Sequence, residues 1–376
     1  MTRVFVVADN IISPLGISTT ENFEQLKMSH SGVMLHEDAA ISAEPFYASL
    51  FDQMPDPNAA YTSLTSFELL LLTSIQEAML ESGVDPGDSR SILIISSTKG
   101  NISLLETGGY DESLKDRITL HRSAKIVAGH FGFVNPPVIV SNACISGIVA
   151  ILTGMRLIRS GRYKHAIIAG ADVISKFVMS GFQAFQAVSA SPCKPFDRDR
   201  SGINLGEAAA TLVLSGDRGL TGKIEVAGGA VSNDANHLSA PSRTGEELAF
   251  AIGGALKDAG LSLEDIDFIS AHGTATLYND EMEAKAIALA GLRSVPVNSL
   301  KGYYGHTLGA AGLIESIISI RSMEESLILP TQGFANLGVT TPLNICVEML
   351  QHPISACLKT ASGFGGCNAA LVFSKD

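Results

Sequence analysis

The chain contains one order of strand-like and helix-like segments twice, and this repetition restricts the fold more than any other feature of the sequence. Apolar runs at 3–13 and 222–232 open the two copies. Helix-like segments at 65–82 and 244–259 follow, each next to a glycine typical of a helix end. The later matching pairs are strands 91–97 and 265–273, helices 111–130 and 280–290, apolar helices 145–159 and 309–323, and the closing strand pairs 165–173 with 208–216 and 357–366 with 368–376.

Strands that alternate with helices indicate parallel pairing through crossover connections. Two copies of such a unit predict two packed sheets with helices between them and outside them. Any α/β protein shows some loose self-similarity, but the shared closing strand pair favours duplication. We therefore expect an N-terminal half over residues 1–218 and a C-terminal half over residues 219–376. The stretch 37–61 contains prolines and lacks periodicity, so it predicts a surface or interface loop.

Composition excludes several classes of protein. The 376 residues are 46% hydrophobic and 17% charged, which indicates a well-buried globular protein rather than a disordered one. The net charge of −12 disfavours broad binding to nucleic acid. The five cysteines are odd in number, widely spaced and without a C-x-x-C pair, so they predict neither a disulfide framework nor a zinc site. A reducing cytoplasm fits this usage best.

Membrane insertion is not expected from the sequence. The apolar run at the N-terminus is too short for a signal peptide before it reaches Asp9. The longest uncharged stretch, 126–155, is interrupted by Asn135-Pro136-Pro137. We therefore interpret it as a buried strand, turn and helix rather than a membrane span.

Cys144 is the candidate nucleophile. It follows the short apolar strand 138–140 and precedes an apolar helix, so the thiol lies near the positive end of a helix. Such a position is expected to expose the sulfur and to lower the thiol pKa. Gly147 would allow another backbone segment to approach the turn. The alternative interpretation is a small buried hydrophobic residue, which is common for free cysteine.

Two histidines occupy glycine-containing turns in the second half. His272 ends a strand, which is the usual ligand side of an α/β sheet, and His306 follows Lys301 by five residues. A cation at Lys301 can hold a negative substrate group or tune a histidine. Each residue alone is also typical of an ordinary loop histidine or surface lysine. Because Cys144 and both histidines fall at equivalent or adjacent strand ends of the two halves, we expect them to meet at the centre.

Five motifs occur in order: NACISG around Cys144, KPFDRDRSGINLGEAA from Lys194, AHGTATLYNDEMEA at 271–284, NSLKGYYGHTLGAAGLIE at 298–315 and GFGGCNAALVF at 363–373. On these motifs the chain resembles the β-ketoacyl-acyl carrier protein synthases of the thiolase-fold superfamily. The resemblance is greatest to the elongating type of fatty acid and polyketide synthesis, and it covers essentially the full length. It implies an α/β thiolase-like fold, with internally duplicated βαβαβαββ halves in a layered α-β-α-β-α sandwich.

The resemblance implies that Cys144 takes an acyl group from carrier-protein phosphopantetheine and that malonyl-carrier protein then extends it with loss of CO₂. His272 and His306 complete the implied triad, and no metal or redox cofactor is expected. The implied partners are an acyl carrier protein and a second subunit, in a homodimer or a related heterodimer. The resemblance further implies that Lys301 orients the histidines or engages Glu283, and that Glu283 and Glu315 are buried acids. It implies that the backbone of Phe364 contributes to the oxyanion hole and that its side chain acts as a gate. It also implies that Thr274 and Thr276 hydrogen-bond the pantetheine amides and that Phe182 lines the malonyl side of the site.

Some positions depart from the family pattern. Ile145 follows the nucleophile where a small or polar residue is usual, so it predicts a narrowed or reshaped acyl pocket. Leu300 and Gly302 flank Lys301 where threonine and serine are common, and Cys367 replaces a common threonine or histidine. These differences concern the choice of substrate more than the reaction. A polyene, pigment or polyketide pathway is as plausible as general fatty acid synthesis.

Three other functions stay open. A thiolase-type acyltransferase would use a second cysteine near the C-terminus, such as Cys367, whereas paired histidines with Lys301 favour the condensing type. A catalytically impaired partner subunit resembling a chain-length factor would typically lack Cys144. A Cys-His hydrolase gives no reason for paired histidines. Carrier proteins are acidic, so docking is expected on a local basic patch, for which the candidates are Arg156, Arg159, Arg162 and Lys164.

Overall fold

The computed structural model describes residues 2–375, apart from 56–63, 108–110, 221 and 236–238. Its N-terminal half contains β1 (Phe5–Ile12), α1 (Thr19–Lys27), β2 (Met34–His36), β3 (Phe46–Ser49), α2 (Ser66–Ser82), β4 (Ser91–Ser96), α3 (Leu104–Thr107), α4 (Glu112–Arg117), α5 (Leu120–Phe131), β5 (Val138–Val140), α6 (Ser146–Arg159), β6 (His165–Asp172), α7 (Lys176–Ala184), β7 (Leu205–Gly206) and β8 (Ala208–Ser215). Its C-terminal half contains β9 (Ile224–Asn233), α8 (Glu246–Ala259), β10 (Phe268–Ser270), α9 (Leu277–Leu289), β11 (Pro296–Asn298), α10 (Lys301–Tyr304), α11 (Ala311–Glu325), β12 (Leu327–Ile328), β13 (Asn344–Ile345), β14 (Leu350–Gln351), β15 (Ala356–Gly363) and β16 (Cys367–Lys375).

The strand order confirms the predicted duplication. One half reads β5-β4-β6-β8-β1 and the other reads β11-β10-β15-β16-β9, with β13 added at the far edge. In both halves the first three strands pair in parallel and the last two pairings are antiparallel. The two predicted sheets are nevertheless one hydrogen-bonded sheet of 11 strands, because β1 and β9 meet at the pair Phe5 and Glu225.

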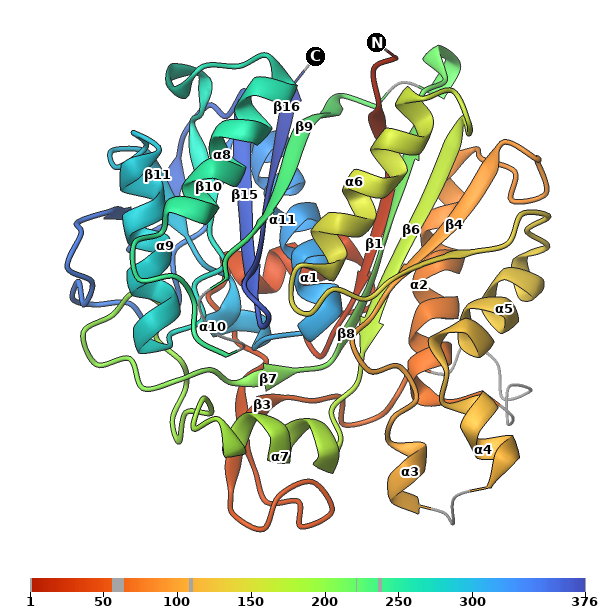
Figure 1. The fold of residues 1–376 in the computed structure, drawn as a ribbon, viewed down its shortest axis with the longest axis horizontal. Helices are drawn as coiled ribbons and strands as arrows, with labels where there is room; N and C mark the ends of the chain where they lie inside the picture. Colours follow the sequence, from red (N-terminus) through yellow and green to blue (C-terminus); the bar gives the residue numbers. More distant parts are fainter. Residues whose placement is uncertain (1, 56–63, 108–110, 221, 236–238, 376) are drawn as a thin grey trace.

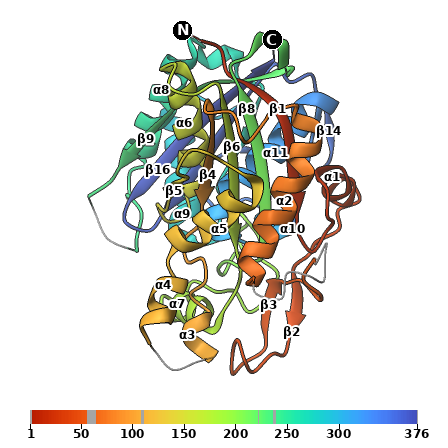
Figure 2. The ribbon, with the colours of Figure 1, turned by 90° about the vertical axis from the view of Figure 1, so that its right-hand side faces the viewer.

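Helices and strands form five layers (Figure 1). The helices α6 and α11 lie between the two halves and contact strands of both. Outside the N-terminal strands lie α2 and α5, which face the viewer in Figure 2, and outside the C-terminal strands lie α8 and α9. This is the α-β-α-β-α arrangement that the sequence predicts.

The two central helices cross in backbone contact because both have a glycine at the crossing. A Cβ atom added at Gly147 of α6 would lie 2.5 Å from the backbone nitrogen of Leu313 on α11. One added at Gly312 would lie 3.0 Å from the backbone nitrogen of Ile148. The first separation is shorter than real Cβ atoms show and the second is tighter than most of their contacts, so glycine is what permits this crossing. The outer helices α2 and α8 end as predicted at left-handed glycines, Gly83 and Gly260.

The structure corrects the prediction for one segment, 37–61, and confirms the interpretation of another, 126–155. Part of 37–61 is not a loop, because β3 pairs with β2 and β7 in a separate three-stranded sheet, and 56–61 lies outside the described residues. The uncharged stretch 126–155 divides into the end of α5, β5 and most of α6. In the described part of the chain, no helix has both the length and the apolar character needed to cross a membrane.

Candidate functional site

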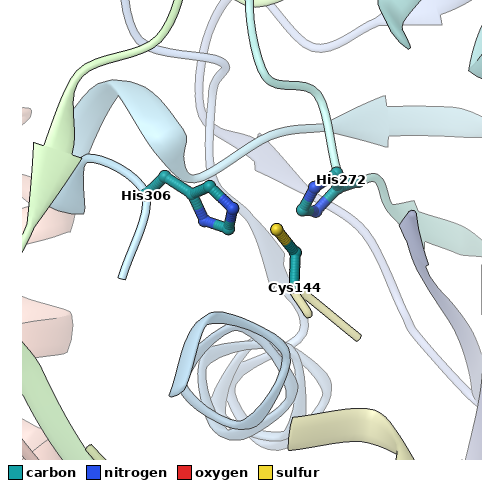
Figure 3. Close-up of side chains that lie close together, drawn as sticks. All are labelled: Cys144, His272 and His306. Atoms are coloured by element: carbon teal, nitrogen blue, oxygen red, sulfur yellow. The ribbon is translucent and has the colours of Figure 1, made fainter. Parts of the chain in front are cut away.

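Cys144 occupies the turn between β5 and α6. The residue before it, Ala143, has a left-handed φ of 44°, which makes the turn sharp. The Ser146 hydroxyl closes the turn, because it accepts from the backbone N–H of Asn142 at 2.7 Å and donates to the carbonyl of Ala143 at 2.6 Å. The turn directs the side chain of Cys144 from the start of α6 toward His272 and His306 of the other half (Figure 3).

The predicted exposure and acidity of the thiol are wrong. Cys144 is only 8% exposed. Burial raises the pKa of its thiol to about 12, and the neighbouring Cys367 acts in the same direction. Lys301 and a hydrogen bond from the backbone of Phe364 lower this pKa, but by less than burial raises it. The resting Cys144 side chain is therefore a protonated thiol, because desolvation of a thiolate outweighs the benefit of the helix N-terminus.

The structure brings Cys144, His272 and His306 together as the sequence predicts. The sulfur and one ring nitrogen from each histidine all lie within 4.8 Å of one another (Figure 3). The ring centroids of the histidines are 5.2 Å apart and their planes are inclined by 82°. His272 follows the end of β10, and His306 follows α10. The sulfur therefore faces two imidazole rings supplied by the opposite half of the molecule.

Both histidines are neutral at neutral pH. Burial and then Lys301 hold each histidine pKa well below its usual value. The Lys301 Nζ atom lies 3.4 Å from Nδ1 of His272, which assigns the ring hydrogen to Nε2. The two ring nitrogens of His306 are buried and have no hydrogen-bond partner among the described residues. The pair can therefore offer N–H donors to an oxygen atom placed between them.

Lys301 acts on the site from behind His272. It is fully buried, and its Nζ donates to the carbonyl of His272 at 3.0 Å. Its ion-pair partner is Glu315. The expected contact with Glu283 is not formed, because Glu283 accepts from the backbone N–H groups of His272 and Gly273 at 2.7 Å each. Both predicted acids are buried beside His272, with different partners.

Sequence reasoning missed two buried charged residues near the site. Asp172, at the end of β6, accepts a hydrogen bond from Gly309 at 2.7 Å and bonds from Ser97 and the backbone that follows it, so it ties the loop after His306 to the N-terminal half. Lys359, in the middle of β15, lies 2.7 Å from Glu315. The available signal was a single charge within an apolar strand, in HAIIAGAD and in ACLKTAS.

A cavity of about 410 Å³ leads to the sulfur. Of the predicted substrate-binding residues, Thr274, Thr276 and Phe182 line it, and the Phe182 ring meets His306 edge-on at 6.4 Å. Phe364 also lines the cavity, 37% exposed, with its ring 5.2 Å from Phe185. The described residues lining the cavity are Cys144, Phe182, Phe185, Gln186, Ala187, Ser201, Gly202, Ile203, Ser239, Ala240, Pro241, His272, Thr274, Thr276, Leu277, Tyr278, Asn279, His306, Ser362, Gly363, Phe364 and Gly366.

The position of Ile145 differs from the expectation. The residue is 1% exposed and belongs to the central apolar core, outside the lining of this cavity. It caps the start of α6, and the chain turns its side chain inward there. The lining of this cavity gives no support to a narrowing of the acyl pocket by Ile145, and that narrowing stays a prediction.

The backbone of Phe364 is held against the nucleophile by a glycine. A Cβ atom added at Gly363 would lie 3.0 Å from the backbone nitrogen of Cys144. The backbone of Phe364 is also close enough to hydrogen-bond the Cys144 thiol. These two segments, one from each half, can present backbone N–H groups to a single oxygen atom above the sulfur.

The candidate docking patch lies at the end of α6 that is far from Cys144. The helix starts beside Cys144 and has 14 residues, so Arg156, Arg159 and the residues after them lie roughly 20 Å away. That end points to the side of the molecule where both termini lie (Figure 1). Arg159 is paired with Asp258 at 3.1 Å, and Lys164 is paired with Asp217. The candidates follow the nucleophile in sequence but do not surround the cavity.

Comparisons with known proteins agree with the fold described above. Two family models, described as the N-terminal and the C-terminal domain of beta-ketoacyl synthase, match residues 1–218 and 224–335. The 3-oxoacyl-[acyl-carrier-protein] synthase 2 of Vibrio cholerae serotype O1 is 28% identical over 411 residues and aligns with 99% of each chain. The tetracenomycin polyketide synthase ketoacyl synthase alpha subunit of Streptomyces glaucescens is 33% identical over 280 residues, which cover 70% of this chain and 66% of that protein. A solved structure named the ishigamide ketosynthase/chain length factor has a TM-score of 0.90 at 27% identity, covering 100% of this chain and 99% of that chain.

Proposed function

The chain belongs to the β-ketoacyl synthase family and is a condensing enzyme, and on this premise we propose how its site works. Cys144 carries the growing acyl chain, and His272 and His306 promote its extension by malonyl-acyl carrier protein. The observation that carries the proposal is one buried thiol facing two neutral imidazoles within 4.8 Å, at the end of a cavity.

The first half-reaction is a thioester exchange. The Cys144 sulfur attacks the acyl carbonyl of the carrier-bound substrate, a new carbon–sulfur bond forms, and the phosphopantetheine sulfur leaves. The thiol proton passes to the departing sulfur, so no net charge is produced. The tetrahedral intermediate carries negative charge on oxygen, and the backbone N–H groups of Cys144 and Phe364 are the proposed donors to it. Thr274 and Thr276 line the cavity where the pantetheine amides would pass.

The second half-reaction forms the carbon–carbon bond. Malonyl-carrier protein loses CO₂, and the electron pair of the broken bond moves into an enolate. The N–H groups of His272 and His306 are the proposed donors to the enolate oxygen. The enolate carbon then attacks the acyl-Cys144 thioester, the cysteine sulfur leaves as a thiolate and takes up a proton from solvent, and the product is a 3-oxoacyl chain longer by two carbons. No metal or redox cofactor is part of the proposal, because the thioester carbonyl delocalises the charge.

Partners and pathway are part of the same proposal. We infer that an acyl carrier protein delivers both substrates and that the enzyme works in the cytoplasm with a second subunit, identical or related. Fatty acid or polyketide synthesis is the proposed pathway, supported by one relative named a 3-oxoacyl-[acyl-carrier-protein] synthase and another named a polyketide synthase subunit. The likeness to a structure named ketosynthase/chain length factor supports a related subunit as partner. The same likeness is compatible with one alternative function, a catalytically inactive subunit that sets the product length of another chain.

Intact-mass measurement with a panel of acyl-loaded carrier proteins tests the proposal. We expect an acyl adduct on the wild-type protein that is absent from Cys144→Ala. The matched control is Cys367→Ala. Cys367 is the residue that would act as the second cysteine if the protein were a thiolase, and the variant that lacks it should still form the adduct. An adduct that persists in Cys144→Ala, or no adduct with any chain, would reject the proposed nucleophile. The latter result would favour the catalytically inactive subunit.

A further inference from the structure

A second buried lysine lies behind the site and has no part in the reaction as described so far. Lys359 stands in the middle of β15 and is fully buried. A buried ammonium group needs partners, since burial alone removes its hydration. Burial lowers the pKa of Lys359, and Glu315 opposes that effect. The residue is therefore a charged group held in the core by specific contacts.

The Nζ atom of Lys359 contacts the strand end that precedes His272, the carbonyl of its own neighbour Thr360, and Glu315. Its Nζ donates to the carbonyls of Ser270 at 3.1 Å and Ala271 at 3.2 Å, and to that of Thr360 at 2.8 Å. Ser270 is the last residue of β10, so these bonds hold the end of that strand. The same Nζ lies 2.7 Å from Oε2 of Glu315.

Two lysines and one glutamate thus hold the backbone around His272 from both sides. Lys359 binds the carbonyls of Ser270 and Ala271, and Lys301 binds the next carbonyl, that of His272. Glu283 accepts the N–H groups of His272 and Gly273. Three consecutive carbonyls and two consecutive N–H groups are therefore bound by charged side chains.

Lys359 also changes the charge around the site. Glu315 pairs with Lys301 through one oxygen and with Lys359 through the other. One carboxylate therefore serves two ammonium groups, and Lys359 acts on both histidines as a nearby positive charge. The titratable groups that face this cluster are Lys301 of α10, Glu315 of α11, Glu283 of α9, Tyr304 beside Glu315, and His272, His306 and Cys144 of the site.

We propose that Lys359 is a positioning residue for the condensation step, which fixes the strand end before His272 and shares Glu315 with Lys301. The inference rests on the proposed function, because His272 must be held in place only if it donates to the enolate. Protonation of His272 at Nδ1 would set that hydrogen against the ammonium of Lys301. A second cation close by resists this protonation, so the ring stays neutral, with its single hydrogen on Nε2 and without an N–H directed at Lys301.

Two substitutions separate the contributions of Lys359. Lys359→Met removes both the charge and the donors at similar length, while Lys359→Gln removes the charge and keeps a donor toward the carbonyls. For the Met variant we expect malonyl-carrier decarboxylation to slow by about tenfold or more, and acylation of Cys144 to change by less than about threefold. For both variants, we expect the acidic limb of the decarboxylation rate to move to higher pH by about half a unit or more, because loss of a cation raises the histidine pKa.

Cys357→Ala is the matched control, because Cys357 is fully buried on the same face of β15 and its thiol bonds Ser319 and the backbone of Ser270 rather than the side chains of Lys359 or Glu315. It should lower the thermal midpoint while leaving the pH profile and the ratio of the two half-reactions unchanged. If Lys359→Met does not fold, Lys359→Gln alone carries the pH test. An unmoved acidic limb, or an equal loss of both half-reactions that Cys357→Ala reproduces, would overturn the inference. A wild-type protein that neither forms the adduct nor decarboxylates malonyl-carrier protein would instead reject the proposed function.

Discussion

Gly147→Ala is the substitution that most directly tests whether the central helix crossing sets the geometry of the site. The added Cβ would lie 2.5 Å from the backbone nitrogen of Leu313, 3.1 Å from the carbonyl carbon of Gly312 and 3.2 Å from the carbonyl oxygen of Gly309. All three atoms belong to backbone, so no rotation of a side chain can make room. The helices α6 and α11 must move apart.

The expected cost is that of an overpacked core. Inserting a methyl group into such a contact destabilises a protein by about 1–3 kcal/mol. Gly253→Ala is the matched control, since Gly253 lies within α8 and a Cβ atom there meets nothing within 4 Å. That variant should gain roughly 0.5–1 kcal/mol, because alanine favours a helix interior over glycine. Urea unfolding followed by circular dichroism measures both free energies.

The same displacement should reach the chemistry. Cys144 lies three residues before Gly147, and His306 lies three residues before Gly309. Separation of the two helices therefore moves the sulfur away from the histidines. We expect the rate of acyl-adduct formation in Gly147→Ala to fall by about 10- to 100-fold, which is typical of misplacing reacting groups by up to 1 Å. Stability and acylation both at wild-type levels in Gly147→Ala would refute the reasoning, as would equal losses in Gly253→Ala.

Three further predictions follow from charges at the site and at the far end of α6. Because the pKa of the Cys144 thiol is raised to about 12, alkylation by iodoacetamide should accelerate by about tenfold per pH unit from pH 7 to pH 10; a plateau below about pH 8 would contradict the buried, protonated thiol. The pKa values of His272 and His306 lie well below 6.5, so below that pH the unfolded chain binds protons that the folded chain does not. The free energy of unfolding should therefore fall on acidification, by up to about 1.4 kcal/mol per pH unit for each histidine, and by less in His306→Asn. The double variant Arg156→Glu and Arg162→Glu should bind the acyl carrier protein within about twofold of the wild-type affinity, as measured by fluorescence anisotropy. A large loss of affinity would instead locate docking at the C-terminal end of α6.

Much of the fold follows from local signals in the sequence. Strand and helix runs recur in the same order, and in the structure they become β5-β4-β6-β8-β1 and its counterpart. Gly83 and Gly260 end equivalent helices, as the pattern predicts. The single hydrogen-bonded sheet could not be predicted, because it depends on one pair, Phe5 and Glu225, between strands more than two hundred residues apart. The boundary between the halves near residue 218 stays a prediction.

The candidate site was predictable in its members but not in its electrostatics. Cys144, His272 and His306 could be located because each follows a strand or turn with a recognisable motif. The acidity of the thiol depends on what covers it, and that cover includes Gly363 and Phe364 from the other end of the chain. From sequence spacing, either Glu283 or Glu315 could pair with Lys301. Only the packing of the folded chain determines that Glu315 is the partner.

The charge state of the resting site favours the second half-reaction over any reaction with water. The thiol is protonated and both histidines are neutral, so the described residues that line the cavity carry no charge. The positive charges of Lys301 and Lys359 lie one layer behind His272, paired with Glu315. The lowered pKa values of the histidines make them weak bases for the activation of water, whereas their oriented N–H groups stabilise negative charge as it develops on a thioester oxygen. We therefore expect acyl-Cys144 to persist until malonyl-carrier protein arrives, and a fast hydrolysis of that adduct in its absence would contradict this argument.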